Sequence, residues 1–315
     1  ADLVGEIERR FGEQHCWSAS RLNRYASCPY GFFAEVVLKL AVRDEPQDGL
    51  DAMQRGSLLH AVLEHFYRNL AASHLETILP NLDEISNYLE QSCTDIFTTA
   101  PRKFGFRAGA LWDYEQQELR RMLRALVSSE CEGSGERATY QPYLLEAAFG
   151  FQNSAPALEI QLEDLKFKLR GFIDRIDQDV DGNLRVIDYK SGGTQYTKND
   201  IEKGLALQTA LYALAAERNW LAPGAQVKES FYLHIPARKP SGRMVFHERV
   251  EENELVESAL QQAARNVQQV RMGVFPSAPA KPAPGGSLCR ENCDFAPVCR
   301  VSRESIRKAR QAGLA

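Results

Sequence analysis

The sequence predicts an α/β protein in which a small mixed sheet is flanked by helices and a helical stretch is inserted. Three observations indicate this class. Apolar residues at helical spacing dominate the chain up to residue 131, alternating apolar and polar residues dominate 143–190, and segments of both kinds follow. A chain of 315 residues with 44% apolar composition is also long enough to bury a full core.

Composition excludes some classes of protein and leaves others open. No apolar run approaches the roughly 20 residues of a membrane span, and the N-terminus lacks the pattern of a signal peptide. We therefore expect a cytoplasmic protein with no membrane partner. The net charge of -4 argues against a uniformly basic surface, but it is compatible with a basic groove. The chain starts at Ala1 instead of a methionine, which is consistent with a domain of a longer protein.

The first part of the chain is predicted to be helical. Serines that can cap a helix open the segment 18–40, which continues at helical spacing and is interrupted at Pro29. Residues 54–72 place apolar side chains three and four positions apart, as an amphipathic helix does. Further helices are predicted over 83–98 and 112–131.

A strand-rich block, 143–190, is followed by a mixed region. The predicted elements of that region are a helix at 206–220, strands near 226–236 and 243–250, and a helix at 251–272. Residues 275–287 are rich in proline and glycine, so we predict an extended connector there. The chain has no GxxxxGK[ST] phosphate loop, and the sequence therefore indicates no P-loop ATPase motor on it.

Residues 171–190, GFIDRIDQDVDGNLRVIDYK, are compatible with two different chemistries. From Asp177 the acids fall at positions one, three, five and twelve, with Gly182 at six, which is nearly the calcium loop of an EF-hand. An EF-hand needs a helix on each side, whereas both flanks here alternate as strands do. Asp181-Gly182 between them is a strong hairpin signal. We therefore favour a turn, with a calcium-binding regulator as an alternative.

Two carboxylates and a lysine are predicted to converge beside this hairpin. If 166–177 and 184–190 are paired strands, Asp174 and Asp188 lie side by side near one sheet edge, and Lys190 projects from the same face as Asp188. Carboxylate oxygens suit Mg²⁺ or Mn²⁺, and the lysine can offset charge that develops on a phosphate. This set indicates a phosphodiesterase. The alternative is an exposed Asp–Lys ion pair beside a solvated turn.

Two helices carry further candidates, each of which also has an ordinary structural explanation. Gly56, His60 and Glu64 share one stripe of the helix at 54–72, where a histidine is commonly a satisfied core residue. Gln208 and Tyr212 share one face of the helix at 206–220, which is typical of an amphipathic boundary. Only their combination with the two carboxylates and the lysine is specific.

Together these motifs resemble the RecB-like branch of the PD-(D/E)XK nucleases, as found in AddB-type subunits of bacterial helicase–nucleases. The matching stretches follow the family's order and span nearly the whole chain. They are RGSLLH ending at His60, GFIDR with Asp174, VIDYK with Asp188 and Lys190, and QTALY with Gln208 and Tyr212. The resemblance implies a restriction-endonuclease-like core.

The resemblance also implies a role for each matched residue. The expected ligands of Mg²⁺ or Mn²⁺ are His60, Asp174, Asp188 and the backbone carbonyl of Tyr189. Lys190 would be the catalytic lysine, and Gln208 and Tyr212 would position the DNA strand. Glu146, in YLLEAAF, stands where relatives often have an acid.

Four cysteines are expected to hold a [4Fe-4S] cluster. Three of the seven cysteines, Cys289, Cys293 and Cys299, lie within eleven residues, and close thiolates in a reducing compartment are typical of metal ligands. The resemblance implies that Cys28 is the fourth ligand and that the cluster ties the two chain ends together. Three residues separate Cys289 from Cys293 where the family commonly has two, and a four-cysteine zinc site is the alternative.

We expect one nuclease domain over 1–315. Its predicted parts are an N-terminal helical part at 16–60, a helical insert at 61–135, a catalytic core at 140–272 and a cysteine segment at 273–315. The expected activity is exonucleolytic cleavage of single-stranded DNA, as part of a helicase–nuclease for DNA repair or recombination. An inactive DNA-binding scaffold is the alternative. The candidates for a DNA track on the insert are Arg102, Lys103, Arg107, Arg120, Arg121 and Arg124.

Overall fold

The computed structural model describes residues 3–40, 49–72, 82–131, 140–281, 289 and 293–313, and its centre is a five-stranded mixed sheet. The strand order is β2-β5-β6-β7-β8. The strands are β2 (Gln141–Phe149), β5 (Gly171–Gln178), β6 (Leu184–Lys190), β7 (Val227–His234) and β8 (Lys239–Val245). The pair β6–β7 is parallel and the other pairs are antiparallel, as the predicted mixed sheet requires.

The aspartate-rich stretch between β5 and β6 is a hairpin turn. Asp179 accepts hydrogen bonds at one carboxylate oxygen from the backbone N–H groups of Asp181 (2.9 Å) and Asn183 (2.8 Å). Gly182 follows with a φ of 83°, a conformation that glycine adopts without steric cost. Strands flank the turn on both sides, so the EF-hand interpretation is wrong because the required helices are missing there.

A second sheet corrects one prediction of the sequence. The expected strand 166–177 is divided at Arg170, because β4 (Leu165–Leu169) pairs with β3 (Leu158–Leu162) and β1 (Cys16–Trp17), whereas β5 pairs with β2 and β6. At the division, the backbone N–H of Arg170 donates to the Trp17 carbonyl at 2.8 Å. The alternating pattern runs through Arg170 without a break, so the change of partner had no local signal.

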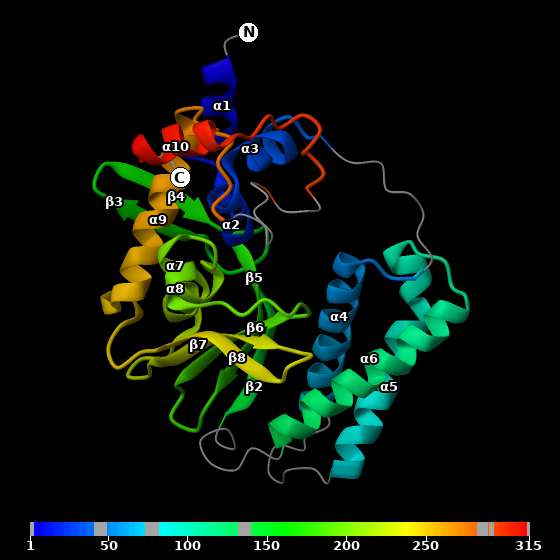
Figure 1. Ribbon diagram of the computed structural model, residues 1–315. Coiled ribbons are helices and arrows are strands. Elements are labelled where there is room, and N and C mark those ends of the chain that lie inside the picture. The colour runs from blue at the N-terminus through cyan, green and yellow to red at the C-terminus, as the bar shows by residue number, and fades with distance from the viewer. Residues whose placement is uncertain are drawn as a thin grey trace.

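Helices from both ends of the chain gather at one end of the molecule (Figure 1). The N-terminal elements are α1 (Leu3–Phe11), α2 (Ala19–Ser27), α3 (Pro29–Phe32) and a π-helical turn, η1 (Phe33–Val37). The predicted interruption at Pro29 is confirmed, since Cys28 adopts an extended conformation and Pro29 opens α3. The C-terminal α10 (Arg303–Gln311) lies beside them in Figure 1.

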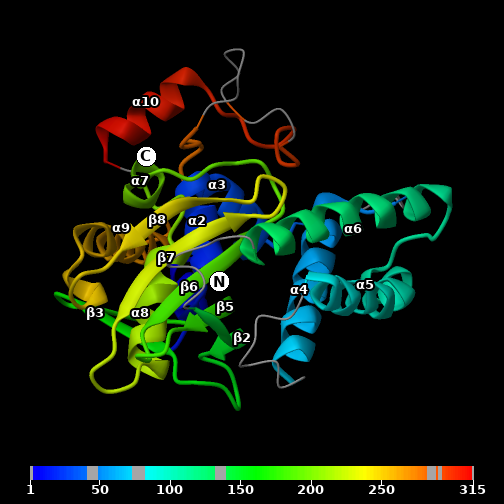
Figure 2. The same cartoon turned by 90° about the horizontal axis from the view of Figure 1, so that it is seen from below.

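Three long helices form an arm that packs on one face of the main sheet. They are α4 (Ala52–Ala72), α5 (Leu82–Phe104) and α6 (Ala110–Cys131). Their buried side chains form a core of their own, which Ile187 and Tyr189 of β6 and Phe231 and Leu233 of β7 join from the sheet. Figure 2 shows that α5 and α6 extend away from the sheet while α4 stays next to it.

The opposite face of the sheet carries the larger core. It is covered by α8 (Gln208–Trp220) and α9 (Glu254–Arg271), with the short α7 (Lys198–Glu202) and 3-10 turn η3 (Val250–Glu252) beside them. The strand β8 begins about four residues before the predicted strand 243–250, and α1, α7 and α10 were not predicted. Most of the expected connector 275–287 lies outside the described residues. In the part of the chain that is described, no helix has the length and apolar character needed to cross a membrane.

Candidate active site

The candidate residues meet where the pairing of β5 with β6 ends. The two strands are in register from Arg175 with Ile187 to Gln178 with Leu184, and beyond Arg175 they diverge. The carboxylate of Asp174 fills the gap and accepts a hydrogen bond from the Tyr189 N–H at 2.7 Å. Both strands are inner strands of the sheet. The expectation of a position near a sheet edge is therefore wrong.

His60 approaches this gap from α4. Its Nε2 lies 3.2 Å from the Tyr189 carbonyl oxygen, and its Nδ1 lies 3.5 Å from Asp174 Oδ1. One turn earlier, a Cβ on Gly56 would meet the Ser191 side chain at 3.2 Å. The glycine therefore allows α4 to pass close to the loop that follows Lys190.

Glu146 completes a group of potential metal ligands with His60 and Asp174. One ligand atom from each of the three lies within 4.8 Å of the others, and the described residues contain no second group of this kind. Glu146 stands on β2 between the residues that pair with Arg175 and Ile173, which places it opposite Asp174. Its φ of 48° is rare within a strand and redirects the side chain there. In the sequence, only the family resemblance pointed to this residue.

Asp188 lies beside this group and is held by two donors. Gln208 Nε2 donates to Asp188 Oδ1 at 2.9 Å, and the Lys190 ammonium forms an ion pair with Oδ2. Lys190 Nζ also donates to Gln208 Oε1 at 3.0 Å and lies 4.9 Å from the ring centroid of Tyr232. The first residue of α8 thus connects the lysine to the carboxylate. Tyr232 was not predicted as a site residue, because it belongs to none of the matched motifs.

Tyr212 lies one helical turn after Gln208 on α8 and is buried. Its hydroxyl oxygen would be 3.1 Å from a Cβ built on Gly171, so a larger residue at the start of β5 would crowd the Tyr212 ring. Burial raises the pKa of Tyr212 far above its ordinary value, and the neighbouring Asp188 adds to the effect. The hydroxyl is therefore a neutral hydrogen-bonding group.

Three carboxylates, one imidazole and one ammonium group share this site. Burial raises the pKa of Glu146 to about 7, with a further contribution from Asp174. Burial and repulsion by Asp174 likewise raise the pKa of Asp188 to about 6, against the effect of Lys190. Burial opposes a charge on His60, but the surrounding carboxylates outweigh it and raise the pKa of His60 to about 9. Protons on His60, Glu146 and Asp188 thus offset part of the carboxylate charge, and a bound cation would displace them.

The donor set suits a small, hard divalent cation. Carboxylate oxygens and a backbone carbonyl are ligands that Mg²⁺ and Mn²⁺ accept, and Mn²⁺ also accepts an imidazole. The carboxylates of Glu146 and Asp174, the His60 ring and the Tyr189 carbonyl all converge at the gap. A bound cation would reduce the repulsion that raises the pKa values of the two carboxyl groups.

A second group of buried charges adjoins the first and was not recognised in the sequence. Arg175 donates to both oxygens of Asp177, at 2.5 and 3.0 Å, and to the Tyr189 hydroxyl at 3.0 Å. Arg185 donates to the same carboxylate at 2.5 Å, and Glu130 of α6 pairs with Arg175 at 3.2 Å. We call these four charged residues the Arg175 cluster. Tyr189 joins both groups, with its backbone at the metal-ligand group and its hydroxyl in the cluster.

The cysteines do not form a single-ion site among the described residues. No three of them bring their sulfurs within 4.8 Å of one another. Burial raises the pKa of the Cys28 thiol. The segments around Cys28 and Cys299 touch, since the Tyr30 hydroxyl donates to the Val298 carbonyl at 3.2 Å. The cysteine segment therefore returns to the start of α3.

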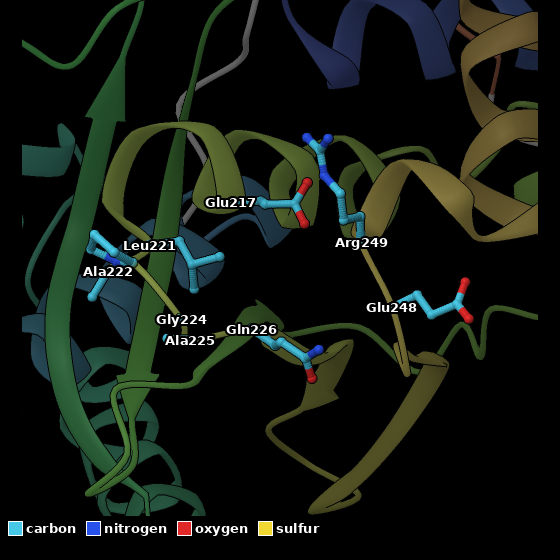
Figure 3. A pocket seen from close by; sticks show the side chains of 9 residues that line it. Glu217, Leu221, Ala222, Gly224, Ala225, Gln226, Glu248 and Arg249 are labelled. Carbon is cyan, nitrogen blue, oxygen red and sulfur yellow. The ribbon is translucent and has the colours of Figure 1, made fainter.

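A hollow in the surface lies away from these groups (Figure 3). It has a volume of about 410 Å³ and lies between the end of α8, the start of β7 and the segment before η3. Val227 at the start of β7 pairs with Leu184, whereas His234 at its end pairs with Lys190. The hollow and the candidate site therefore lie at opposite ends of these two strands.

Ion pairs within the arm engage three of the six basic residues that were expected to form a track for DNA. Arg120 and Arg124 both pair with Glu90, and Arg121 pairs with Glu118. These arginines are therefore engaged within the arm itself, which is the ordinary explanation for charges on a solvated helix face. The other three candidates, Arg102, Lys103 and Arg107, are exposed.

Comparison with known proteins gives one family. Residues 16–300 match the model of the PD-(D/E)XK nuclease superfamily. The chain is 29% identical over 254 residues to the B subunit of the ATP-dependent helicase/deoxyribonuclease of Acetivibrio thermocellus, and the match covers 77% of this chain and 22% of that protein. The proteins of the same name from Clostridium kluyveri and Lysinibacillus sphaericus are each 28% identical, over 72% and 71% of this chain and 20% of each relative. The chain thus spans about a fifth of the length of these curated relatives.

Proposed function

Because the chain belongs to the PD-(D/E)XK nuclease superfamily, we propose that it hydrolyses phosphodiester bonds of DNA with the help of Mg²⁺ or Mn²⁺. The observation that carries this proposal is the meeting of His60, Glu146 and Asp174 with the pair Asp188 and Lys190 at one gap in the sheet. A divalent cation bound at this gap would replace the protons that His60 and the carboxylates hold.

Different residues of the chain would have different roles in such a reaction. The ligands of the cation would be His60, Glu146, Asp174, Asp188 and the Tyr189 carbonyl. A divalent cation in this position polarises a phosphate and acidifies a water molecule. Lys190, held by Asp188 and Gln208, is placed to orient the attacking water and to offset charge on the phosphate. Gln208 accepts one hydrogen bond from Lys190 and donates another to Asp188, so we assign it a positioning role.

We further propose single-stranded DNA as the substrate, with exonucleolytic cleavage. A flexible strand can reach a metal site that lies between the arm and the sheet, whereas a duplex is stiffer and wider. The relatives are named as subunits of helicase/deoxyribonucleases, and a helicase is accordingly the proposed partner. A role in DNA repair or recombination and a cytoplasmic location follow from that proposal. We treat the four parts defined in the sequence as one nuclease domain.

The test is incubation of end-labelled single-stranded DNA with the protein in Mg²⁺, Mn²⁺, Ca²⁺ or excess chelator. We expect products in Mg²⁺ and Mn²⁺ only, because Ca²⁺ is larger and acidifies water less. Undiminished cleavage in chelator would contradict the metal-dependent mechanism. Binding without cleavage in every cation would favour the alternative of an inactive DNA-binding scaffold.

A [4Fe-4S] cluster on Cys28, Cys289, Cys293 and Cys299 is the second proposal. It is supported by the return of the C-terminal segment to α3, whose N-cap residue is Cys28. The cluster would act as a clasp between the two ends of the chain.

The change Cys28→Ser tests the clasp. We expect the purified protein to absorb broadly near ~400 nm, and Cys28→Ser to lose this absorption and unfold at a lower temperature. The matched controls are the serine variants of Cys16, Cys93 and Cys131, which should keep the colour. A colourless wild-type protein with stoichiometric zinc would contradict the cluster, and loss of colour in Cys16→Ser alone would show that the first ligand is assigned wrongly.

A further inference from the structure

Two phenylalanines form an aromatic pair beside the start of β5, with Phe172 exposed and Phe151 half-buried. The rings of Phe151 and Phe172 lie 4.6 Å apart between centroids, at an interplanar angle of 31°. Phe172 is 48% exposed, which is a large fraction for a phenylalanine on an inner strand. The Arg170 guanidinium lies 5.1 Å from the centroid of the Phe151 ring. Aromatic faces and a cation are thus presented together.

The pair lies on the same face of the sheet as the metal-ligand group. Gly171 and Ile173 point to the opposite face, where Gly171 lies against Phe149 and Tyr212 and Ile173 joins the larger core. The alternation of a strand therefore turns Phe172 towards the face on which α4 packs. Asp174, two residues later, contacts His60 of α4 on that face. Residues two apart on a strand are separated by about 7 Å.

The aromatic pair is held in place before any ligand binds. Ser154 Oγ accepts a hydrogen bond from the Phe151 N–H at 2.9 Å and donates to the Phe151 carbonyl at 3.0 Å. Gly150, with a φ of 76°, donates its N–H to Ala155 O at 2.8 Å and so closes the turn. Phe172 itself is fixed by pairing with Ala148. No ion pair of Arg170 is found within the described part of the chain, so its charge is available to a phosphate.

We propose that Phe151, Phe172 and Arg170 form a stacking site for an unpaired nucleobase next to the scissile phosphate. This inference rests on the proposed nuclease function and names the part of the substrate that the site binds. An extended single strand exposes the faces of its bases, and aromatic side chains bind such faces without sequence preference. The bases of a duplex already stack on one another, so a duplex gains nothing from the pair. The site therefore selects single strands.

The test measures stacking separately from cleavage. Oligonucleotides with 2-aminopurine at successive positions are bound to the protein in Ca²⁺, and quenching of the fluorescence reports stacking. We expect quenching at one position for the wild-type protein and its loss in Phe172→Ala. The same change should weaken binding of single-stranded DNA roughly tenfold, which corresponds to about 1.4 kcal/mol. Phe172→Tyr should retain both properties.

Controls separate the stacking site from general effects. Tyr143→Ala removes an aromatic of similar exposure, 47%, from the other end of β2 and should behave as wild type. Binding of blunt duplex and hydrolysis of methyl p-nitrophenyl phosphate, which has no base, should be unchanged in Phe172→Ala. Unaltered quenching in Phe172→Ala, or an equal loss of duplex binding, would overturn the stacking site. If the wild-type protein cleaves neither substrate while quenching depends on Phe172, the proposed nuclease function fails and the stacking site stands.

Discussion

Two groups of buried charge share strands β5 and β6, and they differ in how well their charges are matched. In the Arg175 cluster, Asp177 is shared by two arginines. Burial alone would raise the pKa of Asp177, but these two partners outweigh it and lower the pKa. At the metal-ligand group the balance is reversed, since the pKa values of Glu146 and Asp188 are raised to about 7 and about 6.

The difference separates a group that stabilises the fold from one that is arranged for a ligand. A buried carboxylate is tolerated when donors satisfy both of its oxygens, which is the situation of Asp177. Carboxylates that repel one another weaken the fold unless a cation joins them. The Tyr189 backbone borders one group and its hydroxyl belongs to the other. The well-matched cluster therefore fixes the strand that carries the mismatched site.

The largest expected effect comes from removing the charge of Lys190 or of Asp188. Lys190→Ala and Asp188→Asn should each lower the rate of single-strand cleavage at least about a thousandfold, because both groups act on charge that develops in the transition state. Asp188 is 2% exposed, so the isosteric asparagine is preferable to alanine for keeping the packing. Initial rates in Mg²⁺, with circular dichroism as a test of folding, measure the effect.

A control in the hairpin turn sharpens this prediction. Asp179→Ala removes the hydrogen bonds of the turn but no residue of the proposed site, so activity should stay within a few fold of wild type. An inactive Asp179→Ala variant together with an active Asp188→Asn variant would contradict the assignment of Asp188 to the active site.

The sequence predicted most of the helices and the residues that meet at the site. The helix at 54–72 extends by only two residues at its start in the structure, because a strong apolar stripe defines it locally. Motif order also anticipated that His60, Asp174 and Asp188 come close. These predictions succeeded because helical periodicity and short motifs are local properties.

What the sequence could not show depends on contacts between distant residues. In the sequence, Asp177 occupies the first position of a possible calcium loop. In the structure it is fully buried and pairs with arginines on β5 and β6. Glu146 lies in a continuous apolar run, and its positive φ has no signal in that pattern. Tyr232 lies beneath Lys190 only because β7 pairs with β6. Each of these features is set by tertiary structure.

The next effect in size is on stability. Asp177→Asn removes the carboxylate charge that two buried arginines share, and loss of one partner from a buried pair costs about 3–5 kcal/mol of unfolding free energy. Urea unfolding at pH 7 in chelator measures this loss. Asp179→Asn, an equivalent change in the exposed turn, should cost much less. Equal stability of Asp177→Asn and wild type would show that the Arg175 cluster does not stabilise the fold.

Lowering the pH should remove the stabilisation of the folded state that Asp177 contributes. Its pKa in the folded protein is below the ordinary value of 3.8, so the folded state binds fewer protons than the unfolded chain in this range. The stabilisation is therefore complete above about pH 4–5 and is lost as the pH falls towards the folded pKa. The difference between wild type and Asp177→Asn should shrink over that interval in a series of unfolding curves.

The smallest expected effect has the opposite sign and belongs to Glu146. Its pKa of about 7 exceeds the ordinary 4.5, so the folded state binds more protons and unfolding free energy falls as the pH rises from 4.5 to 7. Glutamine cannot ionise, so in chelator Glu146→Gln should exceed wild type by roughly 1 kcal/mol at pH 8, after allowance for screening by solvent. The two proteins should become equal near pH 5.

Mn²⁺ should reverse the order of these two proteins. A ligand that binds only the folded state stabilises it by about 2.7 kcal/mol at a hundred times its Kd. Wild type should gain this stability at pH 8, whereas Glu146→Gln, with one carboxylate fewer, should gain less at the same concentration. A variant that is less stable than wild type in chelator would mean that Glu146 is satisfied without a cation. The contrast between the mismatched site and the Arg175 cluster would then disappear, because both groups would stabilise the fold by themselves.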